Sequence, residues 1–163
     1  MIPEKQKKTE RWNKIKNSYS WLHDIDYRLM PDKYKIGKGE QGVLICQPYK
    51  GELLPYWRFK NPSIAQESSD KIFEIFQYYL EKNDFIGADM ARKFLQMGYT
   101  RARRYANHPS GRKYDSESGQ ELPRSTDNLL KAESASIFYV RWKEAEENPV
   151  YKQWKQDWKK KYG

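Results

Sequence analysis

The pattern of apolar and polar positions predicts that most of this chain is helical. Apolar residues recur every three or four positions in several segments, which is the spacing of an amphipathic helix. Asn61-Pro62 resembles a helix start, Asp84 can cap the next helix, and Ser125 or Thr126 can cap a third. Asn148-Pro149 is expected to break that third helix. We therefore expect a short helix near residues 12–22, helices over 61–83, 84–107 and 125–147, and a last short helix from Val150.

A different pattern occupies residues 34–59. Apolar runs lie on both sides of a glycine-rich stretch that holds Gly37, Gly39 and Gly42. Short apolar runs around glycine are typical of a hairpin. The predicted fold class is therefore α+β and mostly α: three principal helices, a C-terminal aromatic helix and a small antiparallel hairpin. Residues 1–163 are expected to form a single domain, with residues 1–10 a loose basic arm.

The helix predicted over 84–107 separates into two faces when it is projected at about 100° per residue. One face is a narrow stripe of small or apolar residues that would let another helix approach closely, and the opposite face is basic and is expected to be solvated. Arg101 lies at the edge of the stripe, so it is expected to pair with a carboxylate or to line a pocket. The stripe is Gly87, Ala91, Leu95, Gly98, Ala102 and Ala106, and the basic face is Arg92, Lys93, Gln96, Thr100, Arg103 and Arg104.

The last helix carries an aromatic stripe at helical spacing. Tyr151, Trp154, Trp158 and Tyr162 fall on one face, with lysines around the rest of the helix. Such a stripe usually packs on the domain's own core, and we predict that here. A partner or a membrane surface is the alternative interpretation.

Composition narrows the class of protein. The net charge is +9 and 15% of the residues are aromatic, which favours a folded domain with a polyanionic partner. Cys46 is the only cysteine, so no intrachain disulfide can form. No apolar run is long enough for a membrane span or a signal peptide, so we expect a cytoplasmic protein without a membrane association.

The most distinctive stretch runs from Ala91 to Tyr114 and contains no acidic residue. Arginine suits phosphate and tyrosine can stack on bases, so the leading hypothesis is a nucleic-acid-binding protein, with DNA or RNA as the partner. A further alternative is a protein-interaction factor that docks an acidic host protein. The candidate binding residues are Arg92, Lys93, Arg101, Arg103, Arg104, His108, Arg112 and Lys113, with Tyr99 and Tyr105 stacking or packing behind them.

The glycine-rich stretch has a second interpretation. Gly37, Lys38, Gly39 and Gly42 match G-x-G-x-x-G and could form a phosphate loop, although the apolar residues that follow favour a hairpin turn. An enzyme or binder of a small phosphorylated ligand would bring Arg101, Lys38 and His108 into one pocket. Whether the chain is an enzyme stays open. No catalytic residue, cofactor or metal site is predicted.

Three stretches resemble a known family. They are residues 36–44, residues 54–59, and residues 89–108 with Gly111-Arg112-Lys113-Tyr114. Together they are similar to the domain of unknown function 4385 family, which occurs in bacteria, fungi and tailed phages. The resemblance implies a compact single-domain protein and leaves a role in a phage open. It brings no activity and no catalytic residues.

Overall fold

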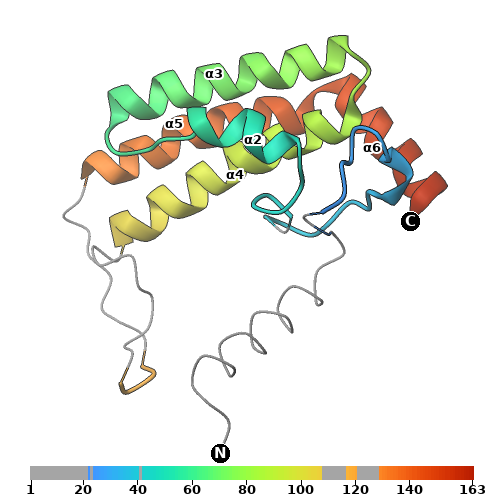
Figure 1. Ribbon diagram of the computed structural model, residues 1–163. Helices are drawn as coiled ribbons and strands as arrows, with labels where there is room; N and C mark the ends of the chain where they lie inside the picture. The colour runs from blue at the N-terminus through green and yellow to red at the C-terminus, as the bar shows by residue number, and fades with distance from the viewer. Residues whose placement is uncertain (1–21, 23, 41, 108–116, 121–128) are drawn as a thin grey trace, which may run out of the picture.

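The computed structural model describes residues 22, 24–40, 42–107, 117–120 and 129–163. The predicted arm at 1–10 and the helix expected near 12–22 lie outside these ranges. The described residues form five α-helices and two short 3-10 helices (Figure 1). The elements are η1 (Pro31–Lys33), α2 (Tyr49–Leu53), η2 (Leu54–Tyr56), α3 (Pro62–Glu81), α4 (Phe85–Asn107), α5 (Leu129–Glu147) and α6 (Pro149–Tyr162).

Helices α3, α4 and α5 form the body of the fold, and each packs against the other two. The chain runs along α3, returns along α4 and runs forward again along α5 (Figure 1). The C-terminal end of α4 therefore lies at the same end of the molecule as the first turns of α3 and α5. At the opposite end, α6 packs against α4 and α5.

The helix boundaries follow the predicted signals. The Asn61 side chain accepts a hydrogen bond from the Ile64 backbone at 2.9 Å and caps α3, with Pro62 in the first turn. Asn83 adopts a left-handed conformation (φ 56°) between α3 and α4. Asp84 then accepts from the Gly87 backbone, and Asn148 caps α6 in the same way. The predictions for α3, α4 and the start of α6 are therefore confirmed.

Small residues let α4 lie close to its neighbours, as predicted. The whole stripe of small and apolar positions on α4 is buried. A methyl group added to Gly87 would lie 2.5 Å from the Tyr79 ring, and one added to Gly98 would lie 2.3 Å from the Phe138 ring. These two glycines thus set the close contact of α4 with α3 and α5.

The predicted hairpin at 34–59 is wrong, and so is the α+β class. The described residues contain no strand, only an isolated bridge between Asp26 and Gln47, and the fold is mostly helical. Backbone hydrogen bonds three or four residues apart connect this segment, such as Cys46 N to Gly42 O at 2.9 Å and Lys50 N to Cys46 O at 2.9 Å. From Val43 onward its buried residues are Val43, Cys46, Tyr49 and Leu53, and a spacing of three or four residues is helical.

The aromatic stripe of α6 packs on the protein's own core, as predicted. Tyr151 is fully buried, and its ring lies 5.7 Å from Phe76 and 5.9 Å from Phe85. The Trp158 ring lies 5.1 Å from Phe85, and its indole N–H donates to the Tyr34 carbonyl at 2.9 Å. Trp158 therefore connects the last helix to the loop before α2.

Candidate functional site

A charged centre lies inside the fold, on the first three turns of α4. The Asp89 carboxylate is completely buried and accepts from Arg92 at 3.0 Å and from the Tyr151 hydroxyl at 2.6 Å. Its second oxygen accepts a short hydrogen bond from the Tyr34 hydroxyl. The centre thus joins α4, α6 and the loop before α2 through one carboxylate.

The centre shifts the pKa values of its members in opposite directions. Burial by itself would raise the pKa of Asp89, but Arg92, Lys93 and the two tyrosine hydroxyls outweigh it and hold that pKa below its usual range. Burial lowers the pKa of the Lys93 ammonium to about 8, although the negative charge of Asp89 opposes this shift. Asp89 is therefore held as a carboxylate at neutral pH.

Two of the predicted binding residues belong to this centre. Arg92 is 4% exposed and Lys93 is 0% exposed, so the expectation of a solvated basic face is wrong for the N-terminal half of α4. The physical reason is that α6 and the loop before α2 cover this face and supply the partners that a buried charge needs. Arg92 also donates to the Tyr151 hydroxyl at 2.9 Å and to Gln96 at 2.8 Å.

The glycine-rich loop lies along α4. The Lys93 ammonium donates to the Gly37 carbonyl at 3.3 Å, and Thr100 hydrogen-bonds to the Glu40 carboxylate. Lys38 and Gly39 are exposed, and Gly39 and Gly42 have positive φ angles of 57° and 87°. The glycines therefore serve a tight loop against α4. A phosphate contact of Gly37, Lys38, Gly39 and Gly42 stays a prediction.

The last two turns of α4 differ from its first half. Arg103 and Arg104 are exposed and Arg101 is half-buried. Within the described part of the chain, none of these three guanidinium groups forms a hydrogen bond or an ion pair. In contrast, Arg92 and Arg141 each pair with an aspartate. The ion pair expected for Arg101 is thus not seen among these residues.

Residues from three segments gather around Tyr105, which lies on the same turns of α4 as these arginines. The Tyr105 ring lies 6.0 Å from the Phe59 ring. The Lys131 ammonium lies 5.4 Å from the centre of the Phe59 ring and 5.9 Å from that of Tyr105, and it donates to the Lys60 carbonyl at 2.7 Å. We call this end of the helical body the basic end, and it comprises Phe59, Lys60, Arg101, Arg103, Arg104, Tyr105 and Lys131.

The two tyrosines predicted to stack have different surroundings. Tyr99 packs against α5, where its ring lies 5.7 Å from Trp142 and 5.3 Å from Tyr139. Tyr105 is 37% exposed. Of the two, Tyr105 has the more accessible ring. The remaining candidates, His108, Arg112 and Lys113, lie outside the described residues.

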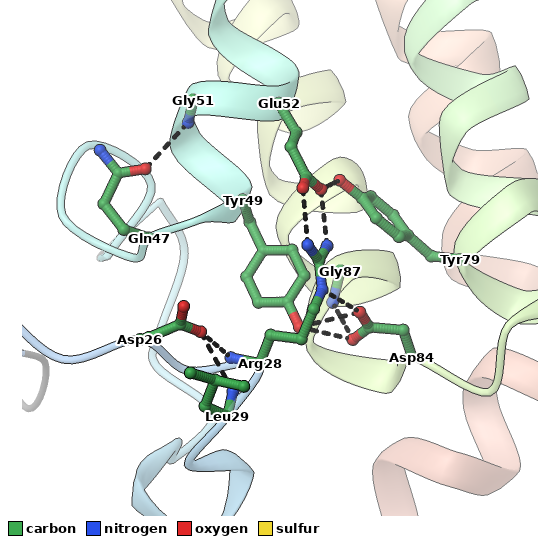
Figure 2. A network of polar contacts seen from close by, with 10 residues as sticks. All are labelled: Asp26, Arg28, Leu29, Gln47, Tyr49, Gly51, Glu52, Tyr79, Asp84 and Gly87. Atoms are coloured by element: carbon green, nitrogen blue, oxygen red, sulfur yellow. Dashed lines mark hydrogen bonds and ion pairs between the residues drawn. The ribbon is translucent and has the colours of Figure 1, made fainter.

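A second polar network joins the loop before α2 to α2, α3 and the start of α4 (Figure 2). The Arg28 guanidinium donates to both oxygens of Glu52 at 2.7 and 2.6 Å and lies 3.5 Å from Asp84. The Tyr79 hydroxyl donates to Glu52 at 2.6 Å, and the Tyr49 hydroxyl donates to Asp84 at 2.8 Å. Hydrogen bonds to Arg28, stronger than the opposing effect of burial, lower the pKa of Glu52.

A cavity of about 620 Å³ opens beside this network. Arg28, Glu52, Tyr79 and Lys82 are among the residues that line it. The Arg28 guanidinium already pairs with the carboxylates of Glu52 and Asp84. The network therefore serves mainly to hold the loop before α2 against the helices. No sequence motif indicates this network, because its members are far apart in the chain.

Two further kinds of site are absent from the described residues. No group of three or more His, Cys, Asp or Glu side chains is placed to hold a metal ion. None of the helices there combines the length and the apolar character that crossing a membrane requires.

Comparison with known proteins gives one match. The chain belongs to the family described as a domain of unknown function (DUF4385), whose sequence model covers residues 17–161. No curated protein and no solved structure matches the chain.

The buried centre has a signal in the sequence that the helical projection missed. Asp89 is followed by Arg92 and Lys93 three and four positions later, where side chains meet on a helix. Such a triplet inside the otherwise apolar stretch of residues 85–95 indicates an internal ion pair. The aromatic part of the basic end has no such signal, since Phe59, Tyr105 and Lys131 come together only in the folded chain.

Proposed function

We propose that this protein binds nucleic acid through the basic end. The observation that carries the proposal is the set of three guanidinium groups, on Arg101, Arg103 and Arg104, that have no acidic partner among the described residues. Like charges held together on one helix repel each other, and an anionic partner relieves that repulsion. Guanidinium groups also match the geometry of phosphate oxygens.

Two further observations support a nucleic acid over other anions. The net charge of +9 gives the whole molecule an attraction for a long polyanion. An exposed aromatic ring, Tyr105, lies among the basic side chains, as expected where a base accompanies a phosphate. Phosphate contacts by Arg112 and Lys113, which lie outside the described residues, stay a prediction from the sequence.

Salt-dependent binding tests the proposal directly. Fluorescence anisotropy with labelled DNA and RNA oligonucleotides, single-stranded and duplex, measures the dissociation constant at several salt concentrations. About four phosphate contacts would give a log–log slope near −3 to −4. The double variant Arg103→Ala/Arg104→Ala should bind about tenfold more weakly, and its slope should be smaller by about 2.

A charge-matched variant controls for net charge. Lys71→Ala/Lys82→Ala also removes two positive charges, from α3 and its C-terminal end, and should bind almost as tightly as the wild type. An equal loss in both variants would mean that only net charge matters. Absence of binding to every DNA and RNA at low salt would refute the proposal, and equally tight binding to polyglutamate would favour an acidic protein as the partner.

A small phosphorylated ligand has less support as the partner. That hypothesis brings Arg101, Lys38 and His108 together. The contacts seen place the glycine-rich loop against Lys93 and Thr100, and His108 lies outside the described residues. No contact among the described residues joins Arg101 to Lys38.

A further inference from the structure

The basic end contains a pair of aromatic rings that reaches from the core to the surface. The Phe59 and Tyr105 rings are 6.0 Å apart and inclined by 33°. Phe59 in turn packs on Trp57 at 5.0 Å, and Trp57 packs on the buried Phe94 at 6.1 Å. The outermost ring, Tyr105, is thus supported by a continuous series of rings and is the most accessible of the four.

Positive charges surround this ring pair. Arg101 precedes Tyr105 by one helical turn, so both side chains lie on the same face of α4. The Lys131 ammonium lies within 6 Å of both ring centres, held by the Phe59 and Lys60 carbonyls at 3.2 and 2.7 Å. The ring pair is therefore flanked by cations from two helices, which is the arrangement that a backbone phosphate beside a stacked base requires.

This arrangement is specific to one form of nucleic acid. In a duplex the base faces are covered by neighbouring base pairs, so an exposed ring on the protein gains nothing from them. In a single strand each base has a free face that can stack on an aromatic side chain. Among the described residues the Tyr105 hydroxyl forms no hydrogen bond, so no contact of that group would be broken when a base binds.

We infer that the basic end is a binding site for single-stranded nucleic acid in which one base stacks on Tyr105. This inference rests on the proposed function and adds the substrate class and the stacking residue. The phosphates on either side of that base would contact Arg101, Arg104 and Lys131.

Binding of unstructured twelve-nucleotide strands, oligo-dT and oligo-U, is compared with binding of a duplex of the same length at one salt concentration. The wild type should bind the single strands more tightly. Tyr105→Ala should weaken single-strand binding by roughly 5- to 150-fold, the range measured for loss of one stacked base. It should leave duplex binding almost unchanged, because the arginines are intact.

Two further variants separate stacking from folding. Tyr105→Phe keeps the ring and should bind like the wild type. Tyr105→Leu keeps an apolar contact with Phe59 without an aromatic face and should lose binding as Tyr105→Ala does, with an unchanged thermal melt. A strand that carries 5-iodouracil should crosslink to Tyr105 under ultraviolet light, on the tryptic peptide of residues 105–112.

The outcomes distinguish the two proposals. Equal affinity for duplex and single strand, together with wild-type binding by Tyr105→Leu, would overturn the stacking site but leave nucleic-acid binding by the arginines in place. Absence of binding to all strands would overturn both proposals. Crosslinking to other peptides, with residues 105–112 unlabelled, would also overturn the stacking site.

Discussion

At the scale of single residues, Asp89 has the greatest structural consequence. Its carboxylate accepts hydrogen bonds from Arg92 on α4, Tyr151 on α6 and Tyr34 in the loop before α2. Removing one partner of such a buried set leaves the others unpaired, which costs far more than the set contributes when complete. The buried half of α4 is therefore organised around a polar group, although its surroundings are apolar.

The first prediction concerns Lys93 and pH. Its pKa is about 8 in the folded protein, below the usual value of 10.5. Between these values the unfolded chain binds the proton more strongly, so the free energy of unfolding rises with pH. Relative to Lys93→Met, which cannot titrate, the wild type should gain up to about 3 kcal/mol between pH 8 and 10.5.

Urea denaturation of both proteins at several pH values measures this difference. Titrations shared by the two proteins, such as those of Cys46 and the buried tyrosines, cancel when the two curves are subtracted. Lys71→Met, on the exposed side of α3, is the control and should follow the wild type. A difference between wild type and Lys93→Met that is constant with pH would show that Lys93 stays charged throughout.

At the scale of elements, the predictable parts of the fold are those with long periodic patterns. The three long helices span about five turns or more each, and their caps are local side-chain contacts such as Asn61 to Ile64. The run Val43 to Cys46 is only four residues long, and periodicity cannot separate a strand from a helical turn over that length. Together with Tyr49 and Leu53, the buried positions Val43 and Cys46 recur every three or four residues, which indicates helical turns.

The site was less predictable than the helices. The sequence singled out the arginines of α4, but a projection of one helix cannot show which other elements cover it. Tyr151 and Tyr34 help to bury the part of α4 that carries Arg92 and Lys93. In the chain, Tyr151 is 59 positions after Arg92 and Tyr34 is 58 positions before it. The exposure of Arg103 and Arg104 agrees with the projection, since the described elements leave that end of α4 open.

The second prediction concerns the contact of α4 with α5. Gly98→Ala places a methyl group against the Phe138 ring, where no space exists. The higher helix propensity of alanine offsets this by about 1 kcal/mol. Overpacking of a core costs about 1–3 kcal/mol, so we expect a net loss of up to about 2 kcal/mol in the free energy of unfolding.

A control and a rescue make this test specific. Gly51→Ala lies on α2 with only the Gln47 amide oxygen nearby, at 3.4 Å, and should be neutral or slightly stabilising. Phe138→Leu should cost less in the Gly98→Ala background than in the wild type, because it removes the clash. Additive losses in the double variant would place the strain elsewhere.

At the scale of the whole molecule, charges are arranged differently at the two ends of the helical body. At one end, α6 and the loop before α2 close over the buried charges of Asp89, Arg92 and Lys93. At the other end, the Tyr105 ring of α4 lies 6.0 Å from the Phe59 ring, and Lys131 of α5 donates to the Lys60 carbonyl. Internal charges are neutralised at the first end, whereas at the second end Arg101, Arg103 and Arg104 have no acidic partner among the described residues.

The last prediction tests how the closed end is held together. Trp158 touches Phe85 on α4 and Tyr34 in the loop before α2, 124 positions away, so its removal should loosen both attachments. Trp158→Ala should lower the free energy of unfolding by about 2–4 kcal/mol, somewhat less than a completely buried tryptophan would cost, because Trp158 is half-buried. Trp158→Phe retains the ring contacts and loses only the hydrogen bond, so we expect its free energy of unfolding to fall by only about 1 kcal/mol.

Gln156→Ala, exposed on the same helix, is the control and should leave the free energy of unfolding unchanged. Hydrogen exchange should be faster in the Trp158→Ala variant at the backbone amides of Tyr27 and Tyr34, and unchanged in the centre of α3. An unaltered unfolding curve for Trp158→Ala would mean that Tyr151 alone attaches α6 to the body, and the buried centre at Asp89 would then be the element on which the C-terminal helix depends.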